Sequence, residues 1–341
     1  MDTLTRREKI DALAALGQYI LEHDERLGAH VHRASMTNPW FTKENIAHAL
    51  ESIARQFLDR DALTAWLQPY PDRGDNGRVV GLIAAGNVPL VGFHDVLSVF
   101  VAGHKTQLKL SERDQYLIPF LLKWLAEHEP RVEQQFEIVD KLSGFDAVIA
   151  TGSNNSARYF KQYFGKYPHI IRMNRNAVAV LGGDESEEQL HGLCEDVFRY
   201  FGLGCRSVSH LFVPEGYDFD LLKKVLKEYE HYNQHDKYRN NLDYNTAIYI
   251  LNKEQHIGLP NLLLAQKDQL ISPVGCLYYS LYTSSEALER RLLAQADEIQ
   301  CVVSDLKFTQ VRTVPLGQAQ QPALDDYADG VNTLDFLFDL T

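Results

Sequence analysis

Residues 79–112 read VVGLIAAGNVPLVGFHDVLSVFVAGHKTQLKLSE. The apolar residues 79–84 predict a buried strand, which breaks where the chain continues as Gly86-Asn87-Val88-Pro89. Residues 95–102 have the apolar spacing of a short helix, and residues 106–110 predict a second buried strand. Two buried strands joined by a helix are typical of a parallel sheet that helices cover on both faces.

The flanking residues extend this α/β pattern. Before it, apolar residues recur every three or four positions from Leu4 to about Trp66, which predicts a helical N-terminal segment, and residues 69–77 resemble a linker. After it, we expect the helix 115–127, the strands 136–139 and 147–150, the helix 154–164, the strand 178–181, the helix 185–200, the strand 208–213, the helix 219–229, the strands 247–251 and 277–282, the helix 285–296 and the strand 300–303. The polar residues 229–245 predict a long functional loop.

The composition of the 341 residues excludes several classes of function. Hydrophobic residues make up 45% of the chain, so a folded core is expected rather than disorder. The formal net charge of −12 argues against non-specific binding to nucleic acid or anionic lipid. The longest apolar tract, residues 79–93, is shorter than the ~20 residues of a membrane helix, and the charged N-terminus does not resemble a secretory signal. We therefore expect a cytoplasmic protein without membrane insertion.

Cysteine and histidine spacing predicts no metal site. Cys194, Cys205, Cys276 and Cys301 match neither a C-x-x-C pair nor a zinc pattern, so they are expected to be reduced thiols. The pair His231 and His235 lacks the glutamate of an H-E-x-x-H motif and an obvious third ligand.

Two glycine-containing segments are candidates for chemistry. In Gly202-Leu203-Gly204-Cys205-Arg206, the glycines allow a close approach of ligand to backbone, and Arg206 can favour the reactive thiolate of Cys205. A lone cysteine beside an apolar strand is more often a buried small hydrophobe. Thr151-Gly152-Ser153 ends a strand where a helix begins, which favours binding of a pyrophosphate, although Ser153 or Asn154 can equally be an ordinary helix cap.

Two further segments follow strand ends. The Asn87 carboxamide can donate a hydrogen bond to a developing oxyanion, or it can simply stabilise a turn. Lys109, Ser111 and Glu112 place a cation, a hydroxyl and a carboxylate at a strand end, which suits a ribose or a phosphate but also suits solvent. The basic clusters Arg172 with Arg175 and Lys237 with Arg239 are expected at the solvated surface, and contact with a substrate phosphate is the less favoured alternative.

In this order, the four motifs resemble the aldehyde dehydrogenase superfamily, and most closely its acyl-CoA reductase branch, which includes the fatty acyl reductase of bacterial luminescence operons. The resemblance spans roughly residues 79–303, and residues 314–331 are similar to the tail of short bacterial acyl-CoA reductases. It implies a Rossmann-type cofactor domain joined to an α/β catalytic domain. It also implies that Cys205 is the nucleophile and that Asn87 is the oxyanion donor. The cofactor-binding residues that it implies are Lys109, Ser111, Glu112, Thr151, Gly152 and Ser153.

The sequence departs from the superfamily pattern at residues 180–183. The family element E-L-G-G has become Val180-Leu181-Gly182-Gly183, so the carboxylate that acts as general base is missing. Oxidation of an aldehyde to an acid needs this base to activate water, whereas exchange of a thioester with a thiol does not. The second family carboxylate, which holds the nicotinamide ribose, also has no equivalent, and residues 269–274 occupy its place.

We therefore expect an enzyme that reduces an acyl thioester to an aldehyde with NADPH or NADH through a thioester on Cys205. Glu112 favours NADH because it repels a 2′-phosphate, but the luminescence reductases use NADPH, so both cofactors stay open. The expected substrate is acyl-CoA or an acyl carrier, and either a homo-oligomer or an acyl-activating partner enzyme is compatible with the sequence. The alternatives are a reductase of acyl phosphates of the glutamyl phosphate type and a non-catalytic nucleotide-binding subunit.

The expected domain organisation follows the motifs. Residues 1–78 form a helical segment packed on the cofactor domain, residues 79–180 bind the nicotinamide dinucleotide, and residues 181–313 carry catalysis. The tail 314–341 is expected to return to the cofactor domain.

Overall fold

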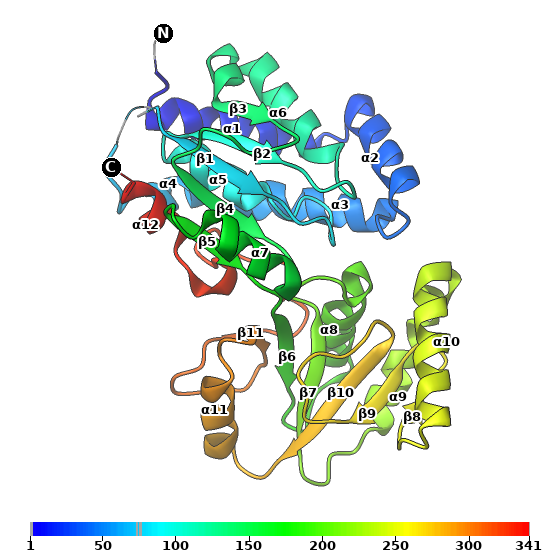
Figure 1. The fold of residues 1–341 in the computed structure, drawn as a ribbon. Coiled ribbons are helices and arrows are strands. Elements are labelled where there is room, and N and C mark those ends of the chain that lie inside the picture. Colours follow the sequence, from blue (N-terminus) through cyan, green and yellow to red (C-terminus); the bar gives the residue numbers. More distant parts are fainter. Residues whose placement is uncertain (1–2, 73, 75–76, 341) are drawn as a thin grey trace. The chain divides into compact units, whose positions relative to one another are not determined.

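The computed structural model describes residues 3–72, 74 and 77–340, so Arg73, Asp75 and Asn76 of the expected linker lie outside the described residues. The chain divides into two compact units (Figure 1). Unit 1 comprises Met1–Asn174 and Ala323–Thr341, and unit 2 comprises Arg175–Pro322.

Unit 1 begins with the expected helical segment. It consists of α1 (Arg6–Leu21), α2 (Glu25–Thr37), α3 (Lys43–Ser52), the π-helical turn η1 (Ile53–Phe57) and α4 (Arg60–Leu67). Thr5 caps α1 in a reciprocal capping box with Glu8, which satisfies backbone N–H groups that the first helical turn leaves free. Tyr19 of α1 stacks on Trp124 of α6 (Leu117–His128) with ring centroids 4.6 Å apart, so this segment packs on a helix of the α/β part of the unit.

The sheet of unit 1 is parallel throughout. Its elements are β1 (Val79–Ile83), α5 (Phe93–Val101), β2 (Lys105–Lys109), α6 (Leu117–His128), the short helix η2 (Pro130–Gln135), β3 (Phe136–Ile138), β4 (Ala147–Thr151), α7 (Asn154–Phe164) and β5 (His169–Arg172). The strand order is β3-β2-β1-β4-β5. On one face, Phe160 and Phe164 of α7 pack near Val148 of β4. Neighbouring β4 residues point the other way, and both Ala147 and Ile149 are also buried, so the sheet is covered on both faces.

Unit 2 is a second α/β layer structure, and its sheet has seven strands where that of unit 1 has five. Its elements are β6 (Asn176–Val180), α8 (Glu187–Phe198), the short helix η3 (Arg199–Gly202), β7 (Val208–Pro214), α9 (Asp220–Glu228), the short helix η4 (Glu230–Gln234), α10 (Asp236–Leu251), β8 (Ile257–Gly258), β9 (Leu263–Gln266), β10 (Cys276–Tyr282), α11 (Ser285–Ala294), β11 (Ile299–Val303) and β12 (Thr313–Val314). The strand order is β12-β11-β6-β7-β10-β9-β8, and β8 runs antiparallel to β9.

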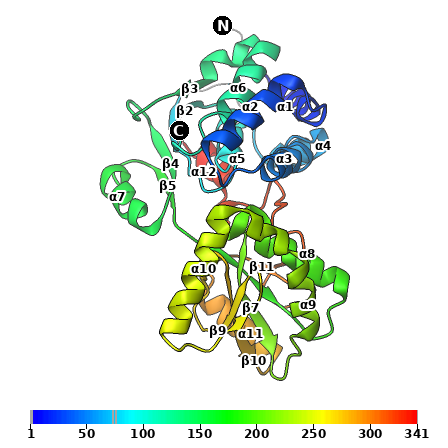
Figure 2. The same ribbon diagram turned by 90° about the vertical axis from the view of Figure 1, so that its right-hand side faces the viewer.

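The core of unit 2 lies on both faces of this sheet. Leu288 and Leu292 of α11 pack with Val178 of β6 and Phe212 of β7 on one face. Leu211, next to Phe212, points the other way and is fully buried as well. Figure 2 shows α8 and α9 side by side along the sheet, and the two helices pack against each other.

The region expected to be a long functional loop is helical instead. Residues 230–234 form η4 and residues 236–245 lie in α10, and residues 247–251, expected to form a strand, continue α10. The buried residues of α10 are Tyr238, Leu242 and Tyr249, whose spacing of four and seven places them on one helix face. The remaining positions of α10 are mostly polar, so the narrow apolar stripe resembles a loop in the sequence.

The boundary between the units also differs from the one expected at residue 180. The chain divides at Asn174, and β6 lies inside the sheet of unit 2 between β11 and β7. The expected tail is divided as well: β12 and residues up to Pro322 belong to unit 2, whereas the short helix η5 (Ala328–Gly330) and α12 (Thr333–Phe338) belong to unit 1.

Arg172 was expected at the solvated surface, and this is wrong. Its side chain is buried at the end of β5, where it pairs with Asp95 of α5 and donates a hydrogen bond of 2.9 Å to Thr333 Oγ1 of α12. The buried guanidinium thus ties the returning tail to the sheet of unit 1.

Candidate active site

The candidate residues of unit 1 gather at one edge of its sheet. Asn87 follows β1, Lys109 to Glu112 end and follow β2, and Thr151 to Ser153 end and follow β4. These three strands are adjacent and parallel, in the order β2-β1-β4, so their carboxyl ends meet at the same edge. Parallel α/β sheets bind their ligands at this edge.

The Asn87 turn is held against the segment after β2. A Cβ on Gly86 would lie 2.4 Å from Ser111 Oγ, so only glycine lets the two segments approach this closely. The Ala84 N–H donates to the Lys109 carbonyl at 3.1 Å, which continues the pairing of β1 with β2. Asn87 itself is half-buried. The backbone that carries the Asn87 carboxamide is therefore fixed, as a preorganised oxyanion donor requires.

Asp114 closes this turn, although it is not among the residues predicted from the sequence. Its Oδ2 accepts a hydrogen bond of 2.8 Å from the N–H of Leu90, whose φ of +61° is unusual for a residue with a branched side chain. Burial raises the pKa of the Asp114 carboxyl to about 6, although backbone N–H groups act in the opposite direction. The sequence signal was an aspartate two residues after Glu112, which is indistinguishable from a surface charge without the fold.

The three residues predicted to contact the cofactor after β2 differ in their surroundings. Lys109 is half-buried, and its Nζ donates to the Asp140 carbonyl at 2.6 Å. Ser111 Oγ accepts a hydrogen bond of 3.3 Å from the Arg113 N–H. Glu112 is exposed. Lys109 and Ser111 are thus already engaged in local hydrogen bonds, whereas the Glu112 carboxylate faces solvent.

The Thr151-Gly152-Ser153 turn leads into α7. Ser153 is the helix cap, because its Oγ accepts a hydrogen bond of 3.2 Å from Ser156 N–H. A Cβ on Gly152 would lie 2.9 Å from both Phe160 and Ser156, so the turn requires glycine to lie this close to the helix. The first turn of α7 has no acidic side chain, which leaves the positive end of the helix dipole uncompensated.

A dinucleotide fits this edge of unit 1 by the chemistry of its donors. The N-terminus of α7 offers backbone N–H groups to a pyrophosphate, and the contact of Gly152 with the helix keeps the approach open. Lys109 and Glu112 supply the cation and the carboxylate that suit phosphate and ribose hydroxyls. The cap by Ser153 and the phosphate turn, which sequence analysis treated as alternatives, are compatible in one structure.

Cys205 lies in a tight turn of unit 2 immediately before β7. The Ser207 N–H donates to the Gly204 carbonyl at 3.0 Å, and the Gly204 N–H donates to Ser207 Oγ at 3.2 Å. We call residues 204–207 the Cys205 turn. Its Arg206 is buried and donates a hydrogen bond of 3.5 Å to the Ala319 carbonyl. Cys205 is half-buried and is not in a disulfide.

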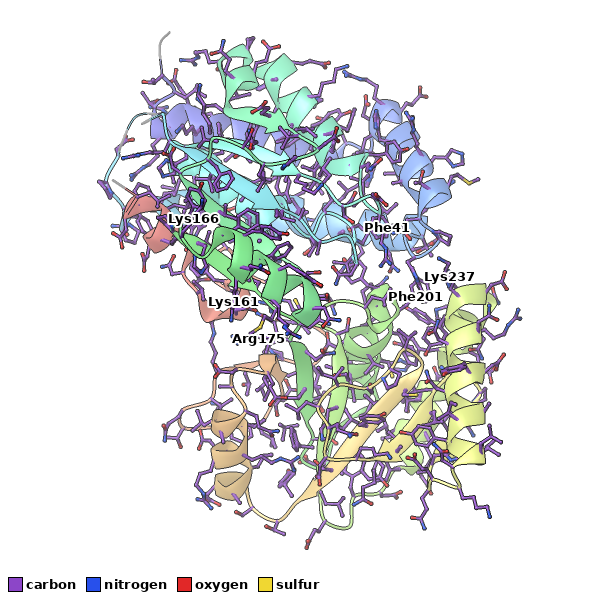
Figure 3. All side chains as sticks on the ribbon, in the orientation of Figure 1. Phe41, Lys161, Lys166, Arg175, Phe201 and Lys237 are labelled. Carbon is purple, nitrogen blue, oxygen red and sulfur yellow. The ribbon has the colours of Figure 1, made fainter. Side chains whose placement is uncertain are left out.

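The backbone before the Cys205 turn is strained. Tyr200 and Phe201 have φ values of +56° and +58°, and Gly202 follows at +72°. The left-handed conformation costs roughly 1–2 kcal/mol for each residue with a side chain. Aromatic packing stabilises this conformation. Phe201, labelled in Figure 3 at the end of α8, has its ring centroid 4.2 Å from that of His235 and 5.5 Å from that of Tyr232. Backbone strain of this kind concentrates at functional sites.

Two of the other cysteines are core residues. Cys194 and Cys276 are buried, and burial raises the pKa of the Cys276 thiol to about 12 and that of Cys194 further. Both therefore stay protonated, and only a thiolate is a good nucleophile. Cys301 is half-buried.

The structure shows what surrounds the two segments that depart from the superfamily pattern. Val180 is buried at the end of β6, so no carboxylate replaces the missing base at this position. The nearby Glu185 accepts hydrogen bonds from the N–H groups of Gly182 and Gly183, which commits its carboxylate to the local turn. Residues 269–274 connect β9 to β10, and Ser209 Oγ donates to the Leu270 carbonyl at 2.7 Å.

One group of side chains in the described part of the chain has the spacing of a metal site. The ligand atoms of Glu187, His191 and Glu228 lie within 4.8 Å of one another. However, Lys224 Nζ lies 2.9 Å from Glu187 Oε1 and supplies the compensating charge, so this surface group is explained without a metal.

The fold is that of the aldehyde dehydrogenases. Aldehyde dehydrogenase 21 from Physcomitrella patens, in complex with its product succinate, superimposes with a TM-score of 0.69 at 13% identity over 98% of this chain and 84% of its own. A mutant of aldehyde dehydrogenase C from Pseudomonas syringae, in complex with NAD+ and octanal, gives 0.63 at 12% identity over 90% and 78%. The NAD+ complex of aldehyde dehydrogenase from Bacillus cereus gives 0.61 at 15% identity over 90% and 72%.

The sequence profile of the acyl-CoA reductase (LuxC) family matches residues 6–305, and the chain belongs to this family. It is thus an oxidoreductase that reduces an acyl group to an aldehyde with NAD(P)H, which confirms the expected class of reaction. No curated protein matches the chain at a significant level. Among the described residues, no helix is both long and apolar enough to cross a membrane.

Proposed function

We propose that the substrate is an acyl thioester, most simply acyl-CoA, and that Cys205 is the nucleophile. The single observation that carries the proposal is the Cys205 turn. Its half-buried thiol follows Gly204 directly, and the strained segment that aromatic packing holds lies just before the turn. The two buried cysteines of the unit, Cys194 and Cys276, have raised pKa values and are poor nucleophiles.

The proposed reaction begins with attack of the Cys205 thiolate on the acyl carbonyl carbon. The new C–S bond forms as the electron pair of the carbonyl moves onto oxygen, and the Asn87 carboxamide and the Cys205 N–H donate hydrogen bonds to that oxyanion. When the carbonyl re-forms, the bond to the CoA sulfur breaks and CoA leaves as a thiolate that takes up a proton. The acyl group then remains on Cys205 as a thioester.

Lys109, Ser111, Glu112 and the Thr151 to Ser153 turn would hold the nicotinamide dinucleotide in this proposal. When bound, the cofactor supplies the hydride that reduces the acyl carbon. The chain's own part in this second half is to keep the oxygen hydrogen-bonded by Asn87 and then to release the Cys205 sulfur as the leaving group, so that the aldehyde departs.

The absence of a base near β6 supports thioester exchange over hydrolysis. Val180 occupies the position of the missing carboxylate and Glu185 is engaged by the backbone of Gly182 and Gly183. Without a base to activate water, the thioester on Cys205 survives until reduction. We further propose that the enzyme acts in the cytoplasm, on acyl-CoA or on an acyl group delivered by a partner enzyme.

The test is aldehyde production from a series of acyl-CoA substrates with NADPH or NADH and an aldehyde trap. Cys205→Ala should be inactive, and Asn87→Ala should be about 100-fold to 1000-fold slower but folded. Cys301→Ala, which removes another half-buried thiol of the same unit, should keep its activity. A Cys205→Ala variant with full activity would rule the proposal out, and aldehyde formation from acyl phosphate alone would assign a different substrate class.

A further inference from the structure

A buried carboxylate on α8 is bound by backbone N–H groups from the last part of unit 2. Asp196 is fully buried, and its Oδ2 accepts a hydrogen bond of 2.7 Å from the Gly317 N–H. Its Oδ1 accepts a second, of 2.9 Å, from the Ala319 N–H. We call residues 315–320 the strap. A buried carboxyl group costs free energy unless it is hydrogen-bonded, and here both of its oxygens are satisfied by N–H groups of the strap.

A pair of glycines brings the strap into backbone contact with the same helix. Gly192 lies one turn before Asp196 on α8, and a Cβ there would lie 2.9 Å from the Leu316 carbonyl oxygen. Gly317 has a φ of +86°, and a Cβ on it would lie 2.9 Å from Gly192 Cα. Both positions therefore need glycine, because a side chain on either residue would push the strap away from α8.

The other side of the strap contacts the Cys205 turn. The Ala319 carbonyl accepts a hydrogen bond of 3.5 Å from Arg206 Nη1, and Gln320 Nε2 donates one of 3.4 Å to Ser207 Oγ. Ser207 Oγ is also the acceptor that closes the turn onto Gly204. Both residues that follow Cys205 are thus held by the strap. Each of these contacts is long, so their geometry depends on how firmly the strap itself is fixed.

We propose that the strap positions the nucleophile turn for acyl transfer and that Asp196 is the positioning residue that fastens the strap to α8. The proposal rests on the role proposed above for Cys205. Asp196 acts through two backbone N–H groups and the strap, without being part of the acyl-transfer chemistry. A neutral asparagine would present one acceptor and one NH2 group, so one of the two strap N–H groups would face another donor.

The test measures acylation of Cys205 and turnover separately in Asp196→Asn. Intact-protein mass spectrometry after mixing with acyl-CoA, without NAD(P)H, gives the rate of acyl-enzyme formation. We expect this rate and kcat to fall about tenfold to 100-fold, as expected for an unsatisfied buried donor. The KM for NAD(P)H should not change, because the proposed cofactor residues belong to unit 1. Acylation at the wild-type rate would overturn the proposal.

Gly192→Ala tests the strap with Asp196 intact. Alanine has a higher helix propensity than glycine, so a purely local effect on α8 would be stabilising by about a factor of five in the folding equilibrium. Displacement of the strap should instead slow acylation as Asp196→Asn does. The control is Gly28→Ala in α2, where a Cβ meets nothing within 4 Å, and Glu188→Gln, an exposed acid of α8, controls for charge. Normal acylation in Gly192→Ala would contradict the proposal.

Two further measurements separate the strap from other causes. Iodoacetamide labelling of the buried Cys194 and Cys276 reports unfolding of unit 2, and both should stay protected in each variant. Cys205→Ala reports the proposed nucleophile. If Cys205→Ala is still acylated, the proposed function fails; if it is inert while Asp196→Asn is normal, the strap proposal alone fails.

Discussion

At the scale of single residues, we predict that the charge of Glu112 discriminates between the two nicotinamide cofactors. Its carboxylate is exposed at the carboxyl end of β2, where it can accept hydrogen bonds from ribose hydroxyls but repels a 2′-phosphate. Glu112→Gln should therefore lower the KM for NADPH and raise the KM for NADH, with each change about threefold to tenfold. Initial rates with both cofactors at one acyl-CoA concentration measure this. Equal ratios of the two KM values in wild type and variant would exclude a role for the charge.

The fully buried His210 of β7 gives a pH-dependent contribution to stability. Its Nδ1 donates to the Gln269 carbonyl at 2.9 Å, so the neutral ring can accept from Ser280 at Nε2, where the distance is 2.8 Å. Burial lowers the pKa of His210 from 6.5 to about 4. The folded state thus resists protonation in a range where the unfolded chain accepts a proton. The neutral His210 therefore contributes about 3 kcal/mol to the free energy of unfolding above pH 6.5. This contribution is lost as the pH falls towards 4.

Urea unfolding of wild type and His210→Gln from pH 4 to 7 tests this. The stability difference should shrink as the pH falls, because the glutamine amide keeps one donor and one acceptor without titrating. Asp114 and Asp196 have raised pKa values of about 6 and about 7 and act in the opposite direction, but they are common to both proteins and cancel in the difference. His32→Gln, at an exposed site, should leave the pH dependence unchanged.

At the scale of elements, secondary structure is predicted best where a single spacing of apolar residues dominates the segment. The helix 154–164 was predicted with the bounds that α7 has, because a strand, a capping serine and amphipathic spacing agree there. The mostly apolar, buried strands β1, β4, β6 and β7 were also located to within two residues. The prediction failed over α10, whose buried face is narrow and whose cap is His235, a residue type with no strong capping preference.

The two-residue strands at the edges of the unit 2 sheet were missed for a related reason. β8 and β12 have two residues each, and a segment of this length carries no periodicity. β12 exists because it pairs with β11, so its conformation depends on a partner rather than on its own residues.

The candidate site shows the same division between local and non-local signals. Cys205 and Gly152 stand in motifs that can be recognised along the chain, whereas Asp114, Asp196 and the left-handed Phe201 acquire their roles from contacts with distant or folded segments. A single sequence contains no sign that the N–H of Gly317 will reach a carboxylate 121 positions away.

At the scale of the whole molecule, the proposed nucleophile and the proposed cofactor residues lie in different units, while Asn87 of unit 1 is proposed to act in both half-reactions. Cys205 and the strap lie in unit 2, and the residues proposed to hold the cofactor lie in unit 1. Acylation of Cys205 consumes no cofactor, so a defect confined to the cofactor turn should leave it intact. This separation makes the proposed order of steps testable with one variant in unit 1.

Gly152→Ala is that variant. The added Cβ would lie 2.9 Å from Ser156 and from Phe160, so the turn must move away from the N-terminus of α7 and weaken the grip on a pyrophosphate. We expect the KM for NAD(P)H to rise about tenfold or more, with cofactor excess restoring most of the rate. Acyl-enzyme formation without cofactor, measured by mass spectrometry, should match wild type, with Gly28→Ala as the control. If Gly152→Ala slows acylation as much as reduction, the turn also serves the acyl donor, and the phosphates of CoA must then bind at the same helix end as the cofactor.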